Sequence, residues 1–170
     1  MKMEKIDFLK MTPVEFDNYM CKTYMEFFGD RRKPMTQTCM CWGFEIGKGW
    51  YKTLDTLCKK LASIRKRTGI VVNFNQIKEK YGSGRFYYNI KATEKKLSND
   101  EAAIWDEIIG DIISNAEEKV YHICAGCGEY YSDKISAGWV YDECGSCLVK
   151  KGKFTQEQID NIIKGKENDN

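Results

Sequence analysis

Two short motifs, Cys124-Ala125-Gly126-Cys127 and Cys144-Gly145-Ser146-Cys147, determine how the C-terminal third of this 170-residue chain folds. Each motif holds two cysteines with two residues between them, a spacing that forms a tight knuckle and aims both sulfurs at one point. The neighbouring glycines favour a backbone that curls towards the thiolates. Sixteen residues separate the motifs. That length fits a hairpin that turns near Ser136-Ala137-Gly138 and brings the two pairs together.

We therefore predict a zinc ribbon in which Cys124, Cys127, Cys144 and Cys147 bind one zinc ion as a closed tetrahedral site. Two disulfides, or a chance arrangement, are the alternatives. The segment 1–11 carries five charged residues and lacks the apolar stretch of a signal peptide, so we expect a cytoplasmic protein with reduced thiols. A closed site has no open coordination position, so its expected role is structural. Metal binding of roughly 10–16 kcal/mol would stabilise a segment that has little core of its own.

The rest of the chain predicts helices around a β-hairpin. Capping boxes begin helices after Thr12 and Ser98, and helical apolar spacing predicts helices over 13–28, 50–68, 99–119 and 155–164. The segments 70–77 and 85–90 are β-branched and aromatic, and we expect an antiparallel hairpin whose long connection is 78–84. The prediction is an α+β fold, with helices packed on a hairpin or small sheet, then the zinc ribbon and a short terminal helix. Expected domain boundaries are 1–119, 120–150 and 151–170.

Composition limits the classes of function. Apolar residues make up 42% of the chain, enough for a hydrophobic core, and the formal charge is only +2. A dedicated duplex-DNA binder is normally far more basic, so any contact with nucleic acid must use a local patch. No segment has the ~18 consecutive apolar residues of a membrane span. The sequence says nothing about oligomeric state.

The predicted hairpin carries the best candidate ligand site. Its cations and rings are Lys78, Lys80, Tyr81, Arg85 and Tyr87. Cations suit phosphates, and aromatic rings suit the stacking of bases. An ordinary amphipathic hairpin with solvated lysines is the alternative. In a strand, Arg85 and Tyr87 share one face, while Phe86 and Tyr88 share the other.

A second candidate region precedes the predicted helix 50–68. The stretch Gly47-Lys48-Gly49-Trp50 leads into that helix, whose first amides could receive an anion, although a structural tight turn is the better explanation of the glycines. We include Trp42, Lys48 and Trp50 among the candidate ligand residues. No dinucleotide-binding or phosphate-loop motif accompanies them.

Other reactive side chains admit structural explanations. A second metal site would need Cys21, Cys39, Cys41 and Cys58 to converge, whereas apolar packing suits cysteines on helices. His122 is the only histidine, and we expect it on a strand flanking the cysteines. An enzyme is the third hypothesis, with Glu45, Asp55 and Glu79 as the only carboxylates to consider.

The chain resembles an uncharacterised family of small proteins encoded by tailed phages and prophages. The resemblance covers most of 34–147 and rests on an ordered series of motifs: Met40-Cys41-Trp42-Gly43-Phe44-Glu45, Gly49-Trp50-Tyr51, Leu54-Asp55-Thr56-Leu57-Cys58, Gln76-Ile77-Lys78-Glu79-Lys80-Tyr81-Gly82, Arg85-Phe86-Tyr87, both cysteine pairs and Gly138-Trp139. This chain departs from the family at Gly84, where a leucine is usual, and at Lys48, where an acidic residue is common.

The resemblance favours a binder or inhibitor that acts in the host cytoplasm over a metabolic enzyme. Our leading hypothesis is a non-catalytic zinc-containing protein that binds a phosphate-bearing ligand, as a counter-defence protein sequestering a nucleotide signal would. The alternative is a zinc-ribbon adaptor that binds nucleic acid or inhibits a host protein through Trp139, Tyr141 and the lysines at 150, 151 and 153.

Overall fold

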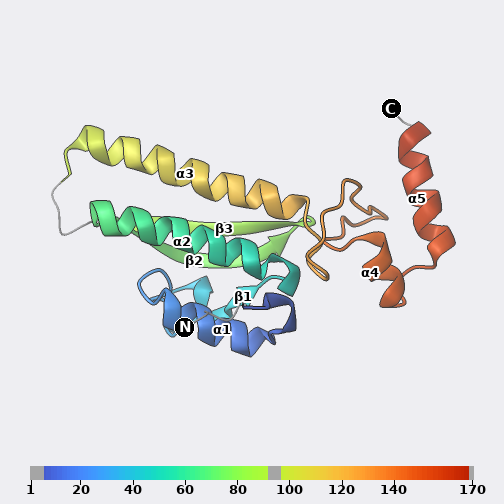
Figure 1. Ribbon diagram of the computed structural model, residues 1–170, viewed down its shortest axis with the longest axis horizontal. Helices are drawn as coiled ribbons and strands as arrows, with labels where there is room; N and C mark the ends of the chain where they lie inside the picture. The colour runs from blue at the N-terminus through green and yellow to red at the C-terminus, as the bar shows by residue number, and fades with distance from the viewer. Residues whose placement is uncertain (1–5, 92–96, 169–170) are drawn as a thin grey trace.

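The computed structural model describes residues 6–91 and 97–168 and has the expected α+β fold. A three-stranded sheet in the order β1-β2-β3 lies behind two long helices, α2 and α3 (Figure 1). Helix α1 lies below them in this view. The cysteine motifs and two short helices, α4 and α5, form the end of the molecule remote from the start of α3.

The hairpin is longer and its turn tighter than the sequence suggested. Strand β2 is Val71–Lys80 and pairs antiparallel with β3, Ser83–Lys91. Only Tyr81 and Gly82 connect the strands, both with positive φ, at 54° and 74°. Such a two-residue turn matches the twist of the strands. The predicted long connection over 78–84 is therefore wrong, and the Glu79 side chain stabilises the turn by accepting the Gly82 amide at 2.6 Å.

A third strand, which was not predicted from the sequence, borders the hairpin. Strand β1, Phe44–Glu45, pairs in parallel with β2 opposite Ile77 and Lys78. It follows the short 3-10 helix η2, Cys39–Trp42, and is too short to show a period of two in the sequence.

The two faces of the hairpin differ in environment. Ile77 and Phe86 are opposed in register and buried against the helices. On the opposite face Lys78 pairs with Arg85, and Gln76 pairs with Tyr87. A register shift between Phe74 and Gln76 keeps the apolar residues of β2 on the buried face. The expected alternation of Arg85 and Tyr87 against Phe86 and Tyr88 is confirmed.

Helix α1, Pro13–Thr23, starts as predicted but ends early. The capping box between Thr12 and Glu15 is present, with Pro13 in the first turn. The predicted continuation to residue 28 is wrong, although Phe27 and Phe28 are buried. Beyond the helix the chain runs beside β2, where the Phe27 carbonyl accepts the Phe74 amide at 3.0 Å. Burial against a strand edge thus accounts for apolar residues whose spacing looked helical.

The two long helices form close to their predicted limits. Helix α2 is Tyr51–Thr68, and Gly69 ends it in the left-handed conformation at φ 79°. Helix α3 is Asn99–Tyr121, with the expected capping box of Ser98 and Glu101. The expected apolar face of α3 is only partly buried, because Ile104 is 55% exposed. The buried part of α3 begins at Ile109.

A loop that contains Gly47 and Gly49 packs against the first cysteine motif. The 3-10 helix η3, Lys48–Trp50, follows Gly47. The Gly49 amide donates to the Ala125 carbonyl at 2.8 Å, and a Cβ on Gly49 would lie 2.0 Å from the Cys124 carbonyl oxygen. The Trp50 indole N–H donates to the Ile123 carbonyl at 2.6 Å. The close approach of two backbones therefore explains the glycines, and the structural-turn interpretation fits.

The C-terminal helices have a small core of their own. Helix α4 is Gly145–Lys150, and helix α5 is Gln156–Asn168. Ile135, Leu148 and Ile159 are buried together. Thr155 and Gln158 exchange hydrogen bonds at the start of α5, as expected. These contacts and those of Gly49 cross the predicted boundaries at 119/120 and 150/151, and the boundaries themselves stay a prediction.

Replacing Gly49 by alanine should destabilise the whole protein. The added methyl group meets the Cys124 carbonyl oxygen at 2.0 Å, so the loop or the knuckle must move. We expect Gly49→Ala to lower the free energy of unfolding by about 3 kcal/mol, measured by urea denaturation. Gly110→Ala in α3 is the control. Its methyl group has an ordinary 3.5 Å contact, and it should raise stability by about 1 kcal/mol. Equal effects of the two substitutions would contradict this account.

Candidate metal centre and ligand surface

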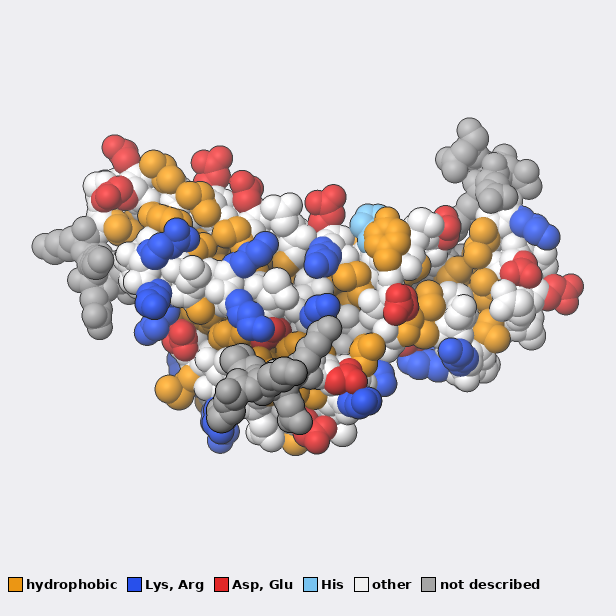
Figure 2. Space-filling model, viewed as in Figure 1, with side chains coloured by type: hydrophobic (Ala, Val, Ile, Leu, Met, Phe, Trp, Pro, Cys, Tyr) orange, Lys and Arg blue, Asp and Glu red, His pale blue; other side chains and the backbone are white. Residues whose placement is uncertain are grey.

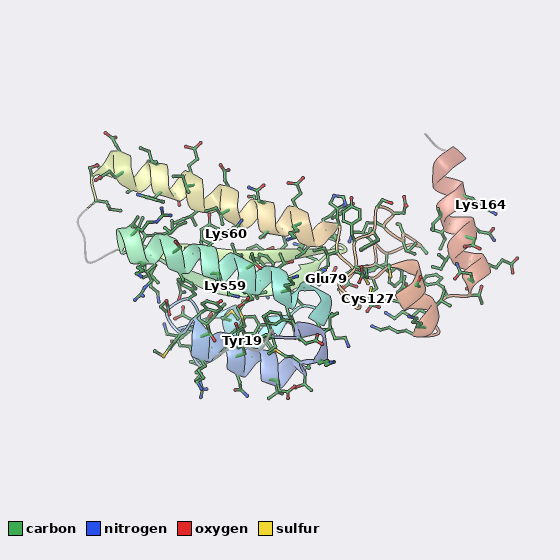
Figure 3. The ribbon with its side chains drawn as sticks, in the orientation of Figure 1. Tyr19, Lys59, Lys60, Glu79, Cys127 and Lys164 are labelled. Atoms are coloured by element: carbon green, nitrogen blue, oxygen red, sulfur yellow. The ribbon has the colours of Figure 1, made fainter. Side chains whose placement is uncertain are left out.

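The first cysteine pair forms a knuckle directly after α3. The Gly128 amide donates to the Cys124 carbonyl, and the Cys124 amide donates to the Glu129 carbonyl, both at 2.9 Å. Gly128 adopts φ 76°, which closes the turn without strain. Cys127 projects at the junction of the sheet and the C-terminal part (Figure 3).

The second pair comes from a helix, which modifies the expected ribbon. Cys144 precedes the first residue of α4, and its carbonyl accepts the Leu148 amide at 3.1 Å. The predicted turn between the pairs is present, because Ser136 and Val140 form an antiparallel bridge. The described segment 120–150 contains isolated bridges and no regular strands. The module therefore joins a loop knuckle to a helix start.

The four sulfurs converge on one point. Their atoms lie within 4.8 Å of one another, and the Cys127 and Cys144 sulfurs are 3.9 Å apart. A tetrahedral zinc with bonds of about 2.3 Å needs sulfurs about 3.8 Å apart. All four cysteines are free thiols, so the disulfide alternative does not describe this structure. The donor set and its geometry fit a metal ion such as zinc.

Backbone amides around Cys124 favour its thiolate. Burial alone would raise the pKa of Cys124, but hydrogen bonds from the amides of Cys144, Cys127 and Gly126 lower it below its ordinary value. The Cys144 amide donates to the Cys124 sulfur at 3.2 Å. Since the thiolate is the form that binds metal, the backbone prepares this cysteine for coordination.

A buried lysine connects the hairpin turn to the cysteine module. The Lys134 ammonium donates to the Gly82 carbonyl and to the Tyr131 hydroxyl, and it lies 4.7 Å from the centroids of the Tyr121 and Tyr131 rings. Burial lowers the pKa of Lys134 to about 8, against the opposing charges of Asp142, Cys124 and Glu79. This residue was not predicted from the sequence, because a lysine next to charged residues gives no local sign of burial.

The remaining cysteines are not brought together. Among the described residues, the four-cysteine cluster is the one group of three or more cysteine, histidine or carboxylate side chains close enough to hold a metal ion. Cys58 is fully buried in the core, and Cys39 is exposed. Apolar packing therefore explains Cys58, as the alternative interpretation held.

The structure gathers three of the predicted ligand residues on the open face of the sheet. Lys78 and Arg85 are cross-strand partners, and Tyr87 lies one pair further along the same face. The Lys78 ammonium is 5.6 Å from the centroid of the Tyr87 ring. Tyr87 remains 42% exposed, so its ring is accessible to a ligand. We call Lys78, Arg85 and Tyr87 the hairpin face.

Two more predicted residues lie at the hairpin tip. The Lys80 ammonium is 5.3 Å from the Tyr81 ring centroid. The Tyr81 ring lies 6.4 Å from Trp139, and these two side chains are 64% and 56% exposed. The tip therefore places Tyr81, a residue of the predicted phosphate-ligand site, next to Trp139, a residue of the predicted adaptor surface.

The other three predicted residues lie elsewhere. Trp50 is fully buried with its indole N–H satisfied, so its assignment to the ligand site is wrong. Trp42 is 56% exposed on η2. Lys48 lines a separate cavity of about 850 Å³ with Lys52 and Lys59. This cavity adjoins α2, whose lysine and arginine side chains are spread over the left half of the molecule in Figure 2.

A polar cavity beside Tyr87 was not predicted. It has a volume of about 540 Å³ and lies between the sheet and the loop 35–39. Amide side chains of both strands line it. The sequence carried a weak signal, because asparagines at 73, 75 and 89 interrupt otherwise apolar and aromatic strands.

The candidate carboxylates each have a local role. Asp55 is buried and accepts hydrogen bonds from Tyr19, Tyr24 and Lys59, two of which are labelled in Figure 3. Burial, with the hydrogen bond to Asp55, raises the pKa of Tyr19 to about 12. Glu79 closes the hairpin turn. The Glu45 carboxylate accepts a long 3.4 Å hydrogen bond from the Gln76 amide.

His122 lies at the end of α3 and not on a strand. It is the C-cap residue of α3, and its ring stacks on Tyr130 with centroids 5.7 Å apart. Its backbone carbonyl accepts the Tyr131 amide at 3.0 Å, which links the helix end to the knuckle.

The fold and site define an α+β protein with a C-terminal four-cysteine cluster. Comparison with protein-family models, curated proteins and solved structures finds no significant match to this chain. No helix among the described residues combines the length and apolarity needed to cross a bilayer.

Purified protein should contain about one tetrahedral metal ion per chain, measured by elemental analysis. Cys147→Ser removes one of four converging sulfurs and should reduce the metal content by at least tenfold. The exposed Cys39 lies outside the cluster, and Cys39→Ser should keep the metal. A metal-free wild-type protein would contradict the assignment, as would equal loss in the two variants.

Proposed function

We propose that this protein is a non-catalytic binding protein that uses the hairpin face to bind a phosphate-bearing ligand. The four-cysteine cluster binds one zinc ion and has a structural role, because four thiolates complete a tetrahedral shell and leave no position for a substrate. The observation that carries the proposal is the pairing of Lys78 and Arg85 beside the exposed ring of Tyr87.

The charges of the hairpin face favour an anion. Lys78 and Arg85 form no ion pair within residues 6–91 and 97–168, and Glu45, the cross-strand neighbour of Lys78, accepts from the Gln76 amide. A guanidinium can bind two phosphate oxygens, and a neighbouring ammonium adds a second charge. The Tyr87 ring supplies a stacking surface for a base or sugar.

The resemblance to phage-encoded proteins gives this proposal a biological setting. A phage protein with such a face would sequester a nucleotide signal of host immunity in the host cytoplasm. Support for this setting comes from the motif series and from the basic and aromatic hairpin face.

Reversing charges on the hairpin face should weaken ligand binding. We expect Lys78→Glu and Arg85→Glu each to weaken binding by roughly ten- to a hundredfold, since each replaces attraction to phosphate by repulsion. Calorimetry against a panel of cyclic and linear nucleotides measures the effect. Lys60→Glu, on the exposed side of α2, is the matched control and should leave binding unchanged. Absence of binding across the panel would overturn the proposal, as would loss in the control alone.

A second candidate function is an adaptor that binds single-stranded nucleic acid, supported by the contact of Tyr81 with Trp139. These rings form an exposed aromatic pair beside Lys80. The lysine run adds less than expected, because Lys151 pairs with Glu143 and Lys153 lies over the Tyr141 ring. An inhibitor of a host protein would use the same exposed rings.

The adaptor function predicts salt-dependent binding of single strands. Fluorescence anisotropy with a labelled single-stranded oligonucleotide should show affinity that falls as salt rises. Trp139→Ala should weaken binding by about tenfold, because one stacking surface is lost. Trp42→Ala removes an equally exposed indole on η2 and should have little effect. Affinity that is independent of both salt and Trp139 would exclude this function.

A further inference from the structure

The cavity beside Tyr87 has the chemistry of a base-binding pocket. Strands β2 and β3 contribute Asn75, Gln76, Tyr87 and Asn89, and the loop 35–39 contributes Gln37. Carboxamides present both donors and acceptors, which is what the edge of a nucleobase requires. The volume of about 540 Å³ lies within the range of small-molecule sites.

Several of these polar groups are available to a ligand. The side-chain amides of Gln37 and Asn89 form no hydrogen bond to other described residues. Asp30, the one carboxylate in the lining, is already engaged. Its two oxygens accept from Lys33 at 2.7 Å and from Asn73 at 2.9 Å. The charge of Asp30 is therefore balanced and does not oppose an approaching phosphate.

Asn73, which donates to two residues of the cavity lining, has one polar atom without a partner. Asn73 is 1% exposed, and its amide nitrogen donates to Asp30 and Asn75. Its side-chain oxygen has no hydrogen-bond partner among the described atoms. A buried acceptor without a donor is unfavourable, so this network has capacity for a further donor group or water molecule.

Tyr87 connects the cavity to the two cations of the hairpin face. Gln76 and Tyr87 are opposed in register, and Lys78 and Arg85 form the next pair on the same face. Pairs two residues apart on a strand are separated by about 7 Å. A base in the cavity would therefore lie one pair away from a phosphate on Lys78 and Arg85, with the sugar beside Tyr87.

We infer that this cavity binds the base of a nucleoside phosphate whose phosphate group lies on Lys78 and Arg85. This inference rests on the proposed function and specifies the class of ligand, which can be a free nucleotide or one unit of a single strand. The amides of Gln37, Gln76 and Asn89 hydrogen-bond to the base edge, and the hairpin face binds the phosphate.

Side-chain amide signals in ¹H–¹⁵N NMR spectra test the inference directly. The four ribonucleoside 5′-monophosphates should shift the amide signals of Gln37, Gln76 and Asn89 together with the backbone signals of Lys78 and Arg85. Ribose 5-phosphate has no base, and it should shift the backbone signals and leave those side-chain amides in place. A short single-stranded oligonucleotide that binds at least tenfold more tightly than every monophosphate would identify the strand as the source of the ligand.

Matched variants separate this inference from the function on which it rests. Asn89→Ala should weaken monophosphate binding by about tenfold and leave ribose 5-phosphate binding unchanged. Asn115→Ala removes an exposed amide on α3, outside this cavity, and should change neither. If ribose 5-phosphate and the monophosphates bind equally, and the side-chain amide signals do not shift, the inferred base pocket is wrong. The proposed phosphate site is then retained. No response of Lys78 and Arg85 to any of these ligands overturns both.

Discussion

The approach of the Gly49 backbone to the Cys124 knuckle is the contact on which the architecture depends. The hydrogen bond from Gly49 to Ala125 and that from the Trp50 indole to Ile123 join the start of α2 to the residues that present the first two sulfurs. Cys124 and Ala125 are buried, and Ala125 belongs to the main hydrophobic core. The four-cysteine cluster is thus built into the α+β core, and a change in the geometry of the knuckle reaches α2 through the backbone.

The opposite side of the cysteine module holds the hairpin tip. Lys134 donates to the Gly82 carbonyl, and a Cβ on Gly82 would lie 2.7 Å from the Val140 side chain, so the turn fits closely against the module. Because the tip is fixed, the strands hold Lys78, Arg85 and Tyr87 at a defined spacing on the face that α2 and α3 leave open. The four-cysteine module and the hairpin face are therefore linked through one turn.

Local chemistry made much of this fold predictable. The capping boxes at Thr12 and Ser98 place two helix starts, and paired cysteines predict the convergence of sulfurs, because each signal needs only a few neighbouring residues. Errors arose where tertiary contacts decide the outcome. Phe27 and Phe28 look helical but pack beside β2, and Tyr81 adopts a positive φ that non-glycine residues rarely take.

The sequence predicted which residues belong to the candidate site better than it predicted how those residues are placed in space. Alternation placed Arg85 and Tyr87 on one face, whereas the burial of Trp50 and Lys134 depends on distant segments that no local pattern reveals. The polar cavity likewise needs the loop 35–39 to lie over the sheet.

The position of the knuckle has a consequence for synthesis on the ribosome. A nascent chain emerges N-terminus first, so α1, α2 and the sheet are outside the exit tunnel before Cys144 and Cys147 are translated. Ala125 directly follows the first cysteine and belongs to the main core, so this core is complete only after residue 125 has left the tunnel. The four sulfurs converge only after Cys147 has also emerged, so the last contacts of the core and of the cysteine cluster form late in synthesis.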